Sequence, residues 1–147
     1  MSKTIIKVER LSNNKFLPEY KTSGASGMDL CAAIDEPLTL NPLERKLIPT
    51  GLKFELEKDF EVQIRPRSGL SIKHGITLIN CVGTVDEDYR GEVCVPLVNV
   101  SNQEYTINPG ERIAQMVVAK VEKAEFKIVE KVSETFRGEG GFGSTGK

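Results

Sequence analysis

Short apolar runs recur along the chain and define its predicted secondary structure. They are rich in Val, Ile, Leu and Phe and are separated by Gly, Pro and Asn, which favour turns. Short runs of this composition predict β-strands. The predicted strands cover residues 4–8, 46–48, 52–56, 60–64, 76–79, 93–98 and 113–121.

Alternating polarity over residues 53–64 predicts how two of these strands lie. Phe54, Leu56, Phe60, Val62 and Ile64 fall on one face, and mainly charged or amide side chains occupy the other. This alternation indicates antiparallel strands with one buried face.

Helix is scarce in the prediction. One short helix is expected over residues 68–73, with Ser68 as its N-cap and its end near Gly75. Residues 111–121 are long enough for a helix, but their β-branched content and the Pro109-Gly110 turn favour a strand. Many short strands with little helix predict an all-β sandwich, barrel or jelly roll.

The composition limits the classes of function. The chain has 147 residues, with 20 Lys+Arg, 21 Asp+Glu and a formal net charge of -1. This length suits one domain, and the lack of a basic excess argues against a nucleic-acid partner. No apolar run approaches the roughly 20 residues of a membrane helix, and the N-terminus lacks a signal-peptide pattern. We therefore expect no membrane partner.

The metal and redox chemistry of the chain is limited by its few Cys and His residues. Cys31, Cys81 and Cys94 are odd in number and widely spaced, which favours free thiols in a reducing, cytoplasmic compartment. The sequence assigns these cysteines no further role. A single histidine, His74, and the lack of a CxxC pair argue against a His/Cys metal site.

The C-terminus changes character and reads RGEGGFGSTGK over residues 137–147. Two phosphate-loop patterns occur in it, but both require a following helix, and the sequence ends at Lys147. A disordered tail is one interpretation of this composition. The other is a ligand-binding arm, because Gly-rich backbone, Ser144, Thr145 and Arg137 offer donors to an anion.

Three internal segments also carry candidate chemistry, each with a plain structural alternative. Residues 65–71 read RPRSGLS, which suits an anionic oxygen but equally a capped helix with solvated arginines. Residues 83–91 read GTVDEDYRG, a predicted β-hairpin whose acidic tip offers a general base or is simply a solvated turn. Gln115 interrupts an apolar strand, so it must bond to backbone or to a ligand if buried.

Five segments in this order resemble the five motifs of the homotrimeric dUTPase family. The resemblance runs from about residue 15 to the end, and five motifs in order are far more specific than any one. The segments are ASGMDLCAA at 25–33, RPRSGLS at 65–71, GTVDEDYRG at 83–91, PGERIAQMV at 109–117 and RGEGGFGSTG at 137–146.

The resemblance implies an all-β, jelly-roll-like subunit that assembles as a threefold trimer. Residues 1–132 would form the catalytic core, and residues 133–147 a flexible arm that closes over a neighbouring subunit's site. Each active site would then be shared by three chains.

The implied reaction converts dUTP to dUMP and pyrophosphate, which limits uracil incorporation into DNA and supplies dUMP for dTMP synthesis. Asp86 would orient and deprotonate the water that attacks the α-phosphorus. Asp29 would act through water on a Mg²⁺ ion held mainly by the substrate phosphates.

The implied substrate contacts come from several motifs. Tyr89 would pack under the deoxyribose and exclude a 2′-hydroxyl, Phe142 would stack on the uracil, and Asn80 would help to hold the base. The full implied set is Arg67, Ser68, Gly69, Asn80, Gly83, Thr84, Val85, Tyr89, Gln115, Arg137, Phe142, Gly143, Ser144 and Thr145.

Three rival functions are weighed against this interpretation. A dCTP deaminase of the same fold would need a catalytic Glu in a different motif arrangement. A regulatory nucleotide-binding trimer is disfavoured by the intact Asp86, Arg137 and Phe142. A purely structural jelly roll leaves the arm and the acidic segment unexplained.

Overall fold

The computed structural model describes residues 3–146, so Met1, Ser2 and Lys147, the ends of the predicted core and arm, lie outside the described residues. The described part is almost entirely β-structure with one short helix. Its elements are β1 (Lys7–Arg10), β2 (Met28–Cys31), β3 (Leu38–Leu40), β4 (Arg45–Glu55), β5 (Phe60–Arg65), α1 (Ser68–His74), β6 (Ile76–Leu78), β7 (Gly83–Val85), β8 (Glu92–Asn99), β9 (Tyr105–Ile107) and β10 (Arg112–Lys120).

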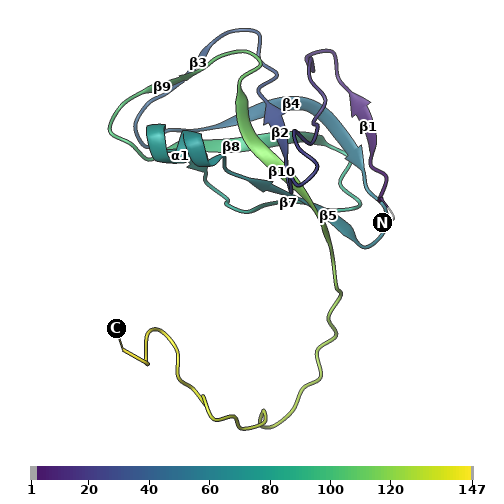
Figure 1. Cartoon of the computed structure of the whole chain (residues 1–147), viewed down its shortest axis with the longest axis vertical. Coiled ribbons are helices and arrows are strands. Elements are labelled where there is room, and N and C mark those ends of the chain that lie inside the picture. Colours follow the sequence, from purple (N-terminus) through teal and green to yellow (C-terminus); the bar gives the residue numbers. More distant parts are fainter. Residues whose placement is uncertain (1–2, 147) are drawn as a thin grey trace.

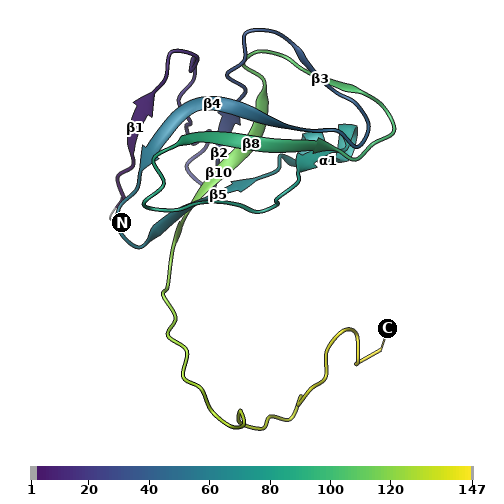
Figure 2. The ribbon, with the colours of Figure 1, turned by 180° about the vertical axis from the view of Figure 1, so that it is seen from behind.

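Two four-stranded antiparallel sheets enclose the core. One has the order β1-β4-β8-β6 and the other β2-β10-β5-β7, while β3 and β9 form a small third sheet. Figures 1 and 2 show the strands gathered in one barrel-like body. Buried side chains from both large sheets, including Ile48, Val95, Val62 and Met116, belong to one hydrophobic cluster. The all-β, jelly-roll-like prediction is therefore confirmed.

The polarity pattern correctly placed the central strands. Phe54, Leu56, Val62 and Ile64 are buried, as their alternation predicted, whereas Phe60 at the start of β5 is only half-buried. Residues 112–120 form β10 and not a helix. Four short strands, β2, β3, β7 and β9, were not among the predicted runs, and β1 begins three residues later than expected.

Pro49, Thr50 and Gly51, which separate the predicted strands at 46–48 and 52–56, lie inside β4. The pairing register with β8 shifts between Pro49 and Lys53, so the strand continues through an irregularity. Side chains replace the missing ladder bonds: Thr50 Oγ1 donates to the Val93 carbonyl at 2.5 Å, and the Gly51 N–H donates to Glu92 Oε1 at 2.9 Å. Gly51 has a φ of +69°, which explains the glycine without a chain reversal.

The predicted β-hairpin at residues 83–91 is replaced by a crossing between sheets. Its flanking strands β6 and β8 do pair antiparallel, for example Leu78 with Leu97. Between them, however, β7 pairs with β5 in the other sheet. The acidic residues therefore lie in a loop, residues 86–91, that joins the two sheets.

The N-cap of helix α1 lies one residue before the predicted cap, Ser68. The N-cap is Arg67, whose backbone is extended and whose side chain makes no capping bond, so Ser68 is the first helical residue. Leu70 anchors the helix in the core. Gly75 ends it with a φ of 66°, as expected for a glycine in the left-handed region.

The C-terminal segment leaves the barrel after β10 ends at Lys120. Residues 121–146 contain no helix or strand and run away from both sheets in Figures 1 and 2. Within residues 3–146, no helix is long and apolar enough to cross a membrane.

Candidate active site

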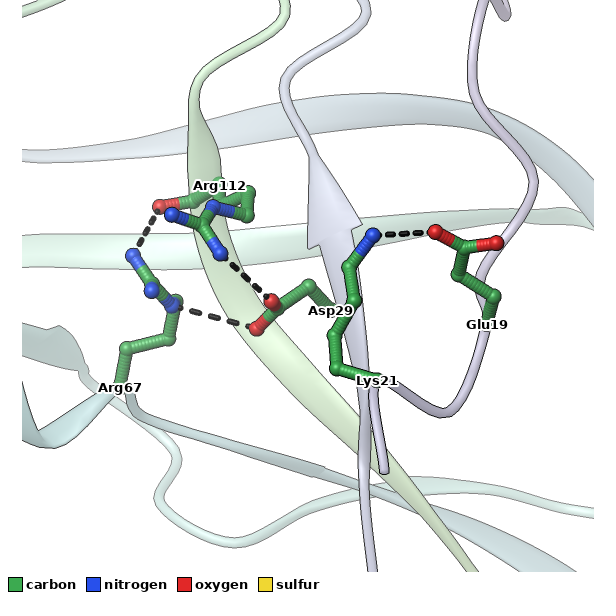
Figure 3. Close-up of polar contacts among 5 residues, drawn as sticks. All are labelled: Glu19, Lys21, Asp29, Arg67 and Arg112. Carbon is green, nitrogen blue, oxygen red and sulfur yellow. Dashed lines mark hydrogen bonds and ion pairs between the residues drawn. The ribbon is translucent and has the colours of Figure 1, made fainter. Parts of the chain in front are cut away.

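A cluster of one carboxylate and two guanidinium groups lies where β2 and β10 meet the end of β5 (Figure 3). Asp29 Oδ1 is 3.2 Å from Arg67 Nε, and Asp29 Oδ2 is 3.3 Å from Arg112 Nη1. Arg67 Nη1 also donates to the Arg112 carbonyl at 3.1 Å. Asp29 and Arg67 are mostly shielded, with side chains 22% and 28% exposed. The cluster carries one net positive charge, which suits an anionic ligand.

Gln115 joins this cluster through the strand register. It pairs with Asp29 of β2 on one side and with Arg65 of β5 on the other. Its Nε2 donates to the Pro66 carbonyl at 2.9 Å. In this structure the Gln115 amide therefore has a backbone partner, which is one of the two partners expected from the sequence. A Cβ atom built on Gly27 would lie 2.7 Å from Gln115 Oε1. Gly27 therefore makes room for the glutamine side chain.

A cavity of about 250 Å³ adjoins the cluster. Asp29, Cys31 and Arg112 line it together with the Glu19–Lys21 ion pair, which Figure 3 also shows. Partial burial, and then the nearby Asp29 charge, raise the pKa of the Cys31 thiol. Cys31 is therefore a protonated lining group at neutral pH. Ser68 and Gly69 follow Arg67 at the exposed start of α1.

The second group of predicted site residues lies around β7. Gly83 and Val85 are buried, and Thr84 between them is exposed. A Cβ atom on Gly83 would lie 3.3 Å from Asn80 Nδ2, so the Asn80 side chain lies against this strand. Asp86 follows β7 as an exposed side chain.

Tyr89 is fixed against its own loop. Its hydroxyl donates to the Glu92 carbonyl at 2.8 Å, and 44% of the residue is exposed. A Cβ atom on Gly91 would lie 2.5 Å from Tyr89 Cζ. Only glycine at position 91 leaves space for the ring in this position.

The two groups do not meet within one chain. Val85 pairs with Val62, so Asp86 lies beside residue 61 of β5, whereas Arg67 lies past the other end of that strand. Six residues of extended chain correspond to roughly 20 Å. The chain therefore presents its predicted site residues as two separate groups, here called half-sites, at opposite ends of one strand.

The predicted arm residues lie apart from both half-sites. Phe142 is fully exposed, and Arg137 Nε donates to the Gly140 carbonyl at 2.7 Å within the arm. Gly143, Ser144 and Thr145 belong to local turns, in which the Ser144 N–H donates to the Gly141 carbonyl at 2.9 Å. The structure thus brings the arm residues together only with one another.

Arg112, Gly27 and Gly91 are site residues that the sequence reasoning missed. Arg112 and Gln115 are three residues apart and would face opposite sides of a regular strand. The β2–β10 register shifts between Arg112 and Ala114, and this irregularity lets both side chains approach Asp29. The spacing in the sequence contains no sign of that shift.

The chain is similar to known dUTPases in both sequence and structure. The sequence model of the dUTPase family matches residues 13–146. A deoxyuridine 5'-triphosphate nucleotidohydrolase from Finegoldia magna is 60% identical over 141 residues, which cover 96% of this chain and 98% of that protein. The dUTPase of Staphylococcus bacteriophage 80alpha, solved with dUPNHPP, has a TM-score of 0.87 at 27% identity and covers 97% of this chain and 99% of its own. A point mutant of the dUTPase from phage phi11 of S. aureus, which coordinates a structural Mg(II) ion, has a TM-score of 0.79 at 22% identity and covers 88% of this chain and 99% of its own.

Proposed function

The chain belongs to the dUTPase family, and from this premise we propose how its own residues carry out the reaction. It is a dUTP diphosphatase that converts dUTP to dUMP and pyrophosphate. The reaction limits uracil incorporation into DNA and supplies dUMP for dTMP synthesis. The observation that carries the proposed mechanism is the pair of half-sites: a cationic cluster around Asp29 and a separate exposed Asp86.

Asp86 is the general base of this proposal. A water molecule attacks the α-phosphorus, and its proton passes to a carboxylate oxygen of Asp86. The bond from the α-phosphorus to the bridging oxygen breaks, so that pyrophosphate leaves. Exposure of Asp86 at the loop suits this role because the carboxylate can reach a bound water molecule.

The Asp29 cluster binds the triphosphate in this mechanism. Arg67, Ser68, Gly69 and Gln115 contact the phosphate oxygens, and Arg112 is added to this set because it shares Asp29 with Arg67. Guanidinium groups suit the task because they donate charge-assisted hydrogen bonds in a fixed fork.

Mg²⁺ fits this donor set only as an ion carried by the substrate. Within residues 3–146, no cluster of three or more His, Cys, Asp or Glu side chains could hold a metal by itself. Mg²⁺ keeps several waters and commonly binds through substrate phosphates, so Asp29 would hold one of its waters. The ion would neutralise charge on the phosphates, and the residues named above would orient them.

The β7 region recognises the base and sugar in this proposal. Asn80, Gly83, Thr84 and Val85 border the uracil, and backbone groups of this segment supply its hydrogen bonds. The Tyr89 ring lies under the deoxyribose and leaves no space for a 2′-hydroxyl. Its anchored position makes the exclusion steric.

A homotrimer with shared sites completes this mechanism. Since Asp86 and Arg67 lie roughly 20 Å apart in one chain, a complete site needs at least two chains. Apolar side chains suited to such contacts are exposed on both sides of Pro96: Leu47 of β4 is 65% exposed, and Ile79, which directly follows β6, is 51% exposed. Phe126 and Ile128, which lead into the arm, are almost fully exposed.

The arm supplies the third part of each site. Arg137, Gly143, Ser144 and Thr145 contact the phosphates, and Phe142 stacks on the uracil, a contact of about 1–3 kcal/mol.

A reducing cytoplasm is part of this proposal, since Cys31, Cys81 and Cys94 are free thiols.

The test is pyrophosphate release with Mg²⁺ on dUTP, dTTP, dCTP and UTP in parallel, together with the Asp86→Asn variant. We expect rapid turnover of dUTP alone, with turnover lost and dUPNHPP binding kept in the variant. Ammonia released from dCTP would instead identify a deaminase. Unchanged turnover in Asp86→Asn would remove that residue from its role.

A further inference from the structure

The proposed general base has no side-chain support of its own. Asp86 is exposed, and its carboxylate makes none of the hydrogen bonds or ion pairs found among residues 3–146. Its position therefore depends on the backbone on its two sides: β7, which pairs with β5 up to Val85, and loop 86–91. Reacting atoms must be held to within about 0.5 Å of productive geometry, so the support of this loop bears directly on turnover.

Most of the hydrogen bonds described for this loop are internal. The Tyr89 N–H donates to the Asp86 carbonyl at 3.2 Å, and Arg90 Nη1 donates to the Glu87 carbonyl at 2.7 Å. These bonds fix the shape of the loop but do not fix where it lies relative to β5.

Glu87 makes the contact that reaches across to another turn. Its Oε2 accepts the backbone N–H of Asp59 at 2.6 Å, in a partly buried position. A hydrogen bond to an ionised carboxylate is shorter and about twice as strong as a neutral one. Glu87 is adjacent to Asp86 in the sequence, so this bond acts one residue from the base.

The turn that receives Glu87 is well anchored. Asp59 lies between β4 and β5, which belong to different sheets, and its φ is 66°. Its carbonyl accepts the N–H of Val121 at 2.8 Å, directly after β10 ends. One residue therefore joins the Asp86 loop, both sheets and the root of the C-terminal segment.

We propose that Glu87 is a positioning residue for Asp86: its carboxylate, bound to the Asp59 N–H, holds the loop so that Asp86 faces the attacking water. This inference rests on the proposed role of Asp86 as the base. Glu87 itself does not touch the substrate. Its removal should therefore slow the chemical step and leave nucleotide affinity in place.

The experiment compares Glu87→Ala, Glu87→Gln and Asp86→Asn with the full-length wild type. Glu104→Ala, an exposed carboxylate outside both half-sites, is the control. We measure kcat and KM for dUTP, Kd for dUPNHPP, the thermal midpoint, and hydrogen exchange at the Asp59 amide. In Glu87→Ala we expect kcat to fall about tenfold or more, with KM and Kd within about twofold, because a 1 Å misplacement can cost on the order of a hundredfold.

The conservative variant separates positioning from general damage to the fold. An amide oxygen can still accept the Asp59 N–H, so Glu87→Gln should keep kcat within about threefold and keep the Asp59 amide protected. Glu87→Ala should speed exchange there without a matching drop in thermal midpoint.

Several outcomes would overturn the inference. Wild-type kcat in Glu87→Ala would show that Asp86 needs no such support, and equal losses in Glu87→Ala and Glu87→Gln would show that the Asp59 bond is not the cause. A parallel loss of dUPNHPP affinity would place Glu87 in binding. If Asp86→Asn keeps full turnover, the failure lies in the proposed role of Asp86.

Discussion

Two separate half-sites predict that two inactive variants can restore each other. Asp86→Asn should disable the proposed base, and Arg67→Gln should disable the proposed phosphate cluster at the other end of β5. In a trimer that builds each site from different chains, a mixed assembly contains a site with Asp86 from one chain and Arg67 from its neighbour. That site carries neither substitution.

The expected magnitude follows from the geometry. In the proposed mechanism, the separation of roughly 20 Å along β5 assigns Asp86 and Arg67 of one chain to different sites. If equal amounts assemble at random, about three quarters of the trimers are mixed, and each has one intact site in three. The mixture should therefore show about one quarter of wild-type activity, while loss of the base alone costs about 10²–10⁴-fold.

The assay is pyrophosphate release after co-expression or after mixing and refolding, with both chains distinguishable by mass. The matched control mixes Arg67→Gln with Gln115→Ala, which lie in the same half-site, so the activity of this mixture should not exceed the mean of its two components. Activity of the first mixture no greater than that of its inactive components would refute the shared site. Equal recovery in the control would refute the assignment of residues to halves.

Three more predictions concern space and reach. Gly27→Ala should raise KM for dUTP about fivefold with little change in thermal midpoint. The new Cβ would displace the Gln115 side chain and remove its proposed hydrogen bond to the phosphates, a loss of about 1 kcal/mol. An unchanged KM would show that Gln115 does not take part in binding. Gly91→Ala should move the Tyr89 ring and lower the ratio of dUTP turnover to UTP turnover. An unchanged ratio would contradict the steric role of Tyr89. Deleting residues 137–147 should abolish most turnover while the thermal midpoint stays constant, as measured by scanning calorimetry; full activity would show that the arm is dispensable.

The sequence predicted the long strands of the fold better than the short ones. Val62 and Ile64 are buried and their neighbours are less so, which gives β5 an alternation of apolar and polar residues that the sequence shows directly. Strands such as β3 and β7 have three residues each, too few to show a period. Pro49 and Gly51 have the composition of a turn, and only the pairing of β4 with β8 reveals that they lie within a strand.

The candidate site divides in the same way. Residue types with evident chemistry, such as Asp86, Arg67 and Gln115, could be selected from their motifs. Gly27 leaves space for the side chain of Gln115, which is distant in the sequence, and Gly91 leaves space for the ring of Tyr89. The sequence alone does not show these contacts. Arg112 depends on a local register shift that pairing with β2 creates.

The C-terminal segment, which lies apart from the barrel, has a consequence for affinity in the proposed mechanism. From the end of β10 at Lys120 to Arg137 an extended chain reaches on the order of 50 Å. A ligand group tethered in this way works at an effective concentration on the order of millimolar. Each arm contact with the nucleotide can therefore be weak and still suffice for closure. Weak contacts would also let the arm release rapidly, so in the proposed mechanism the same tether that captures dUTP allows dUMP and pyrophosphate to escape.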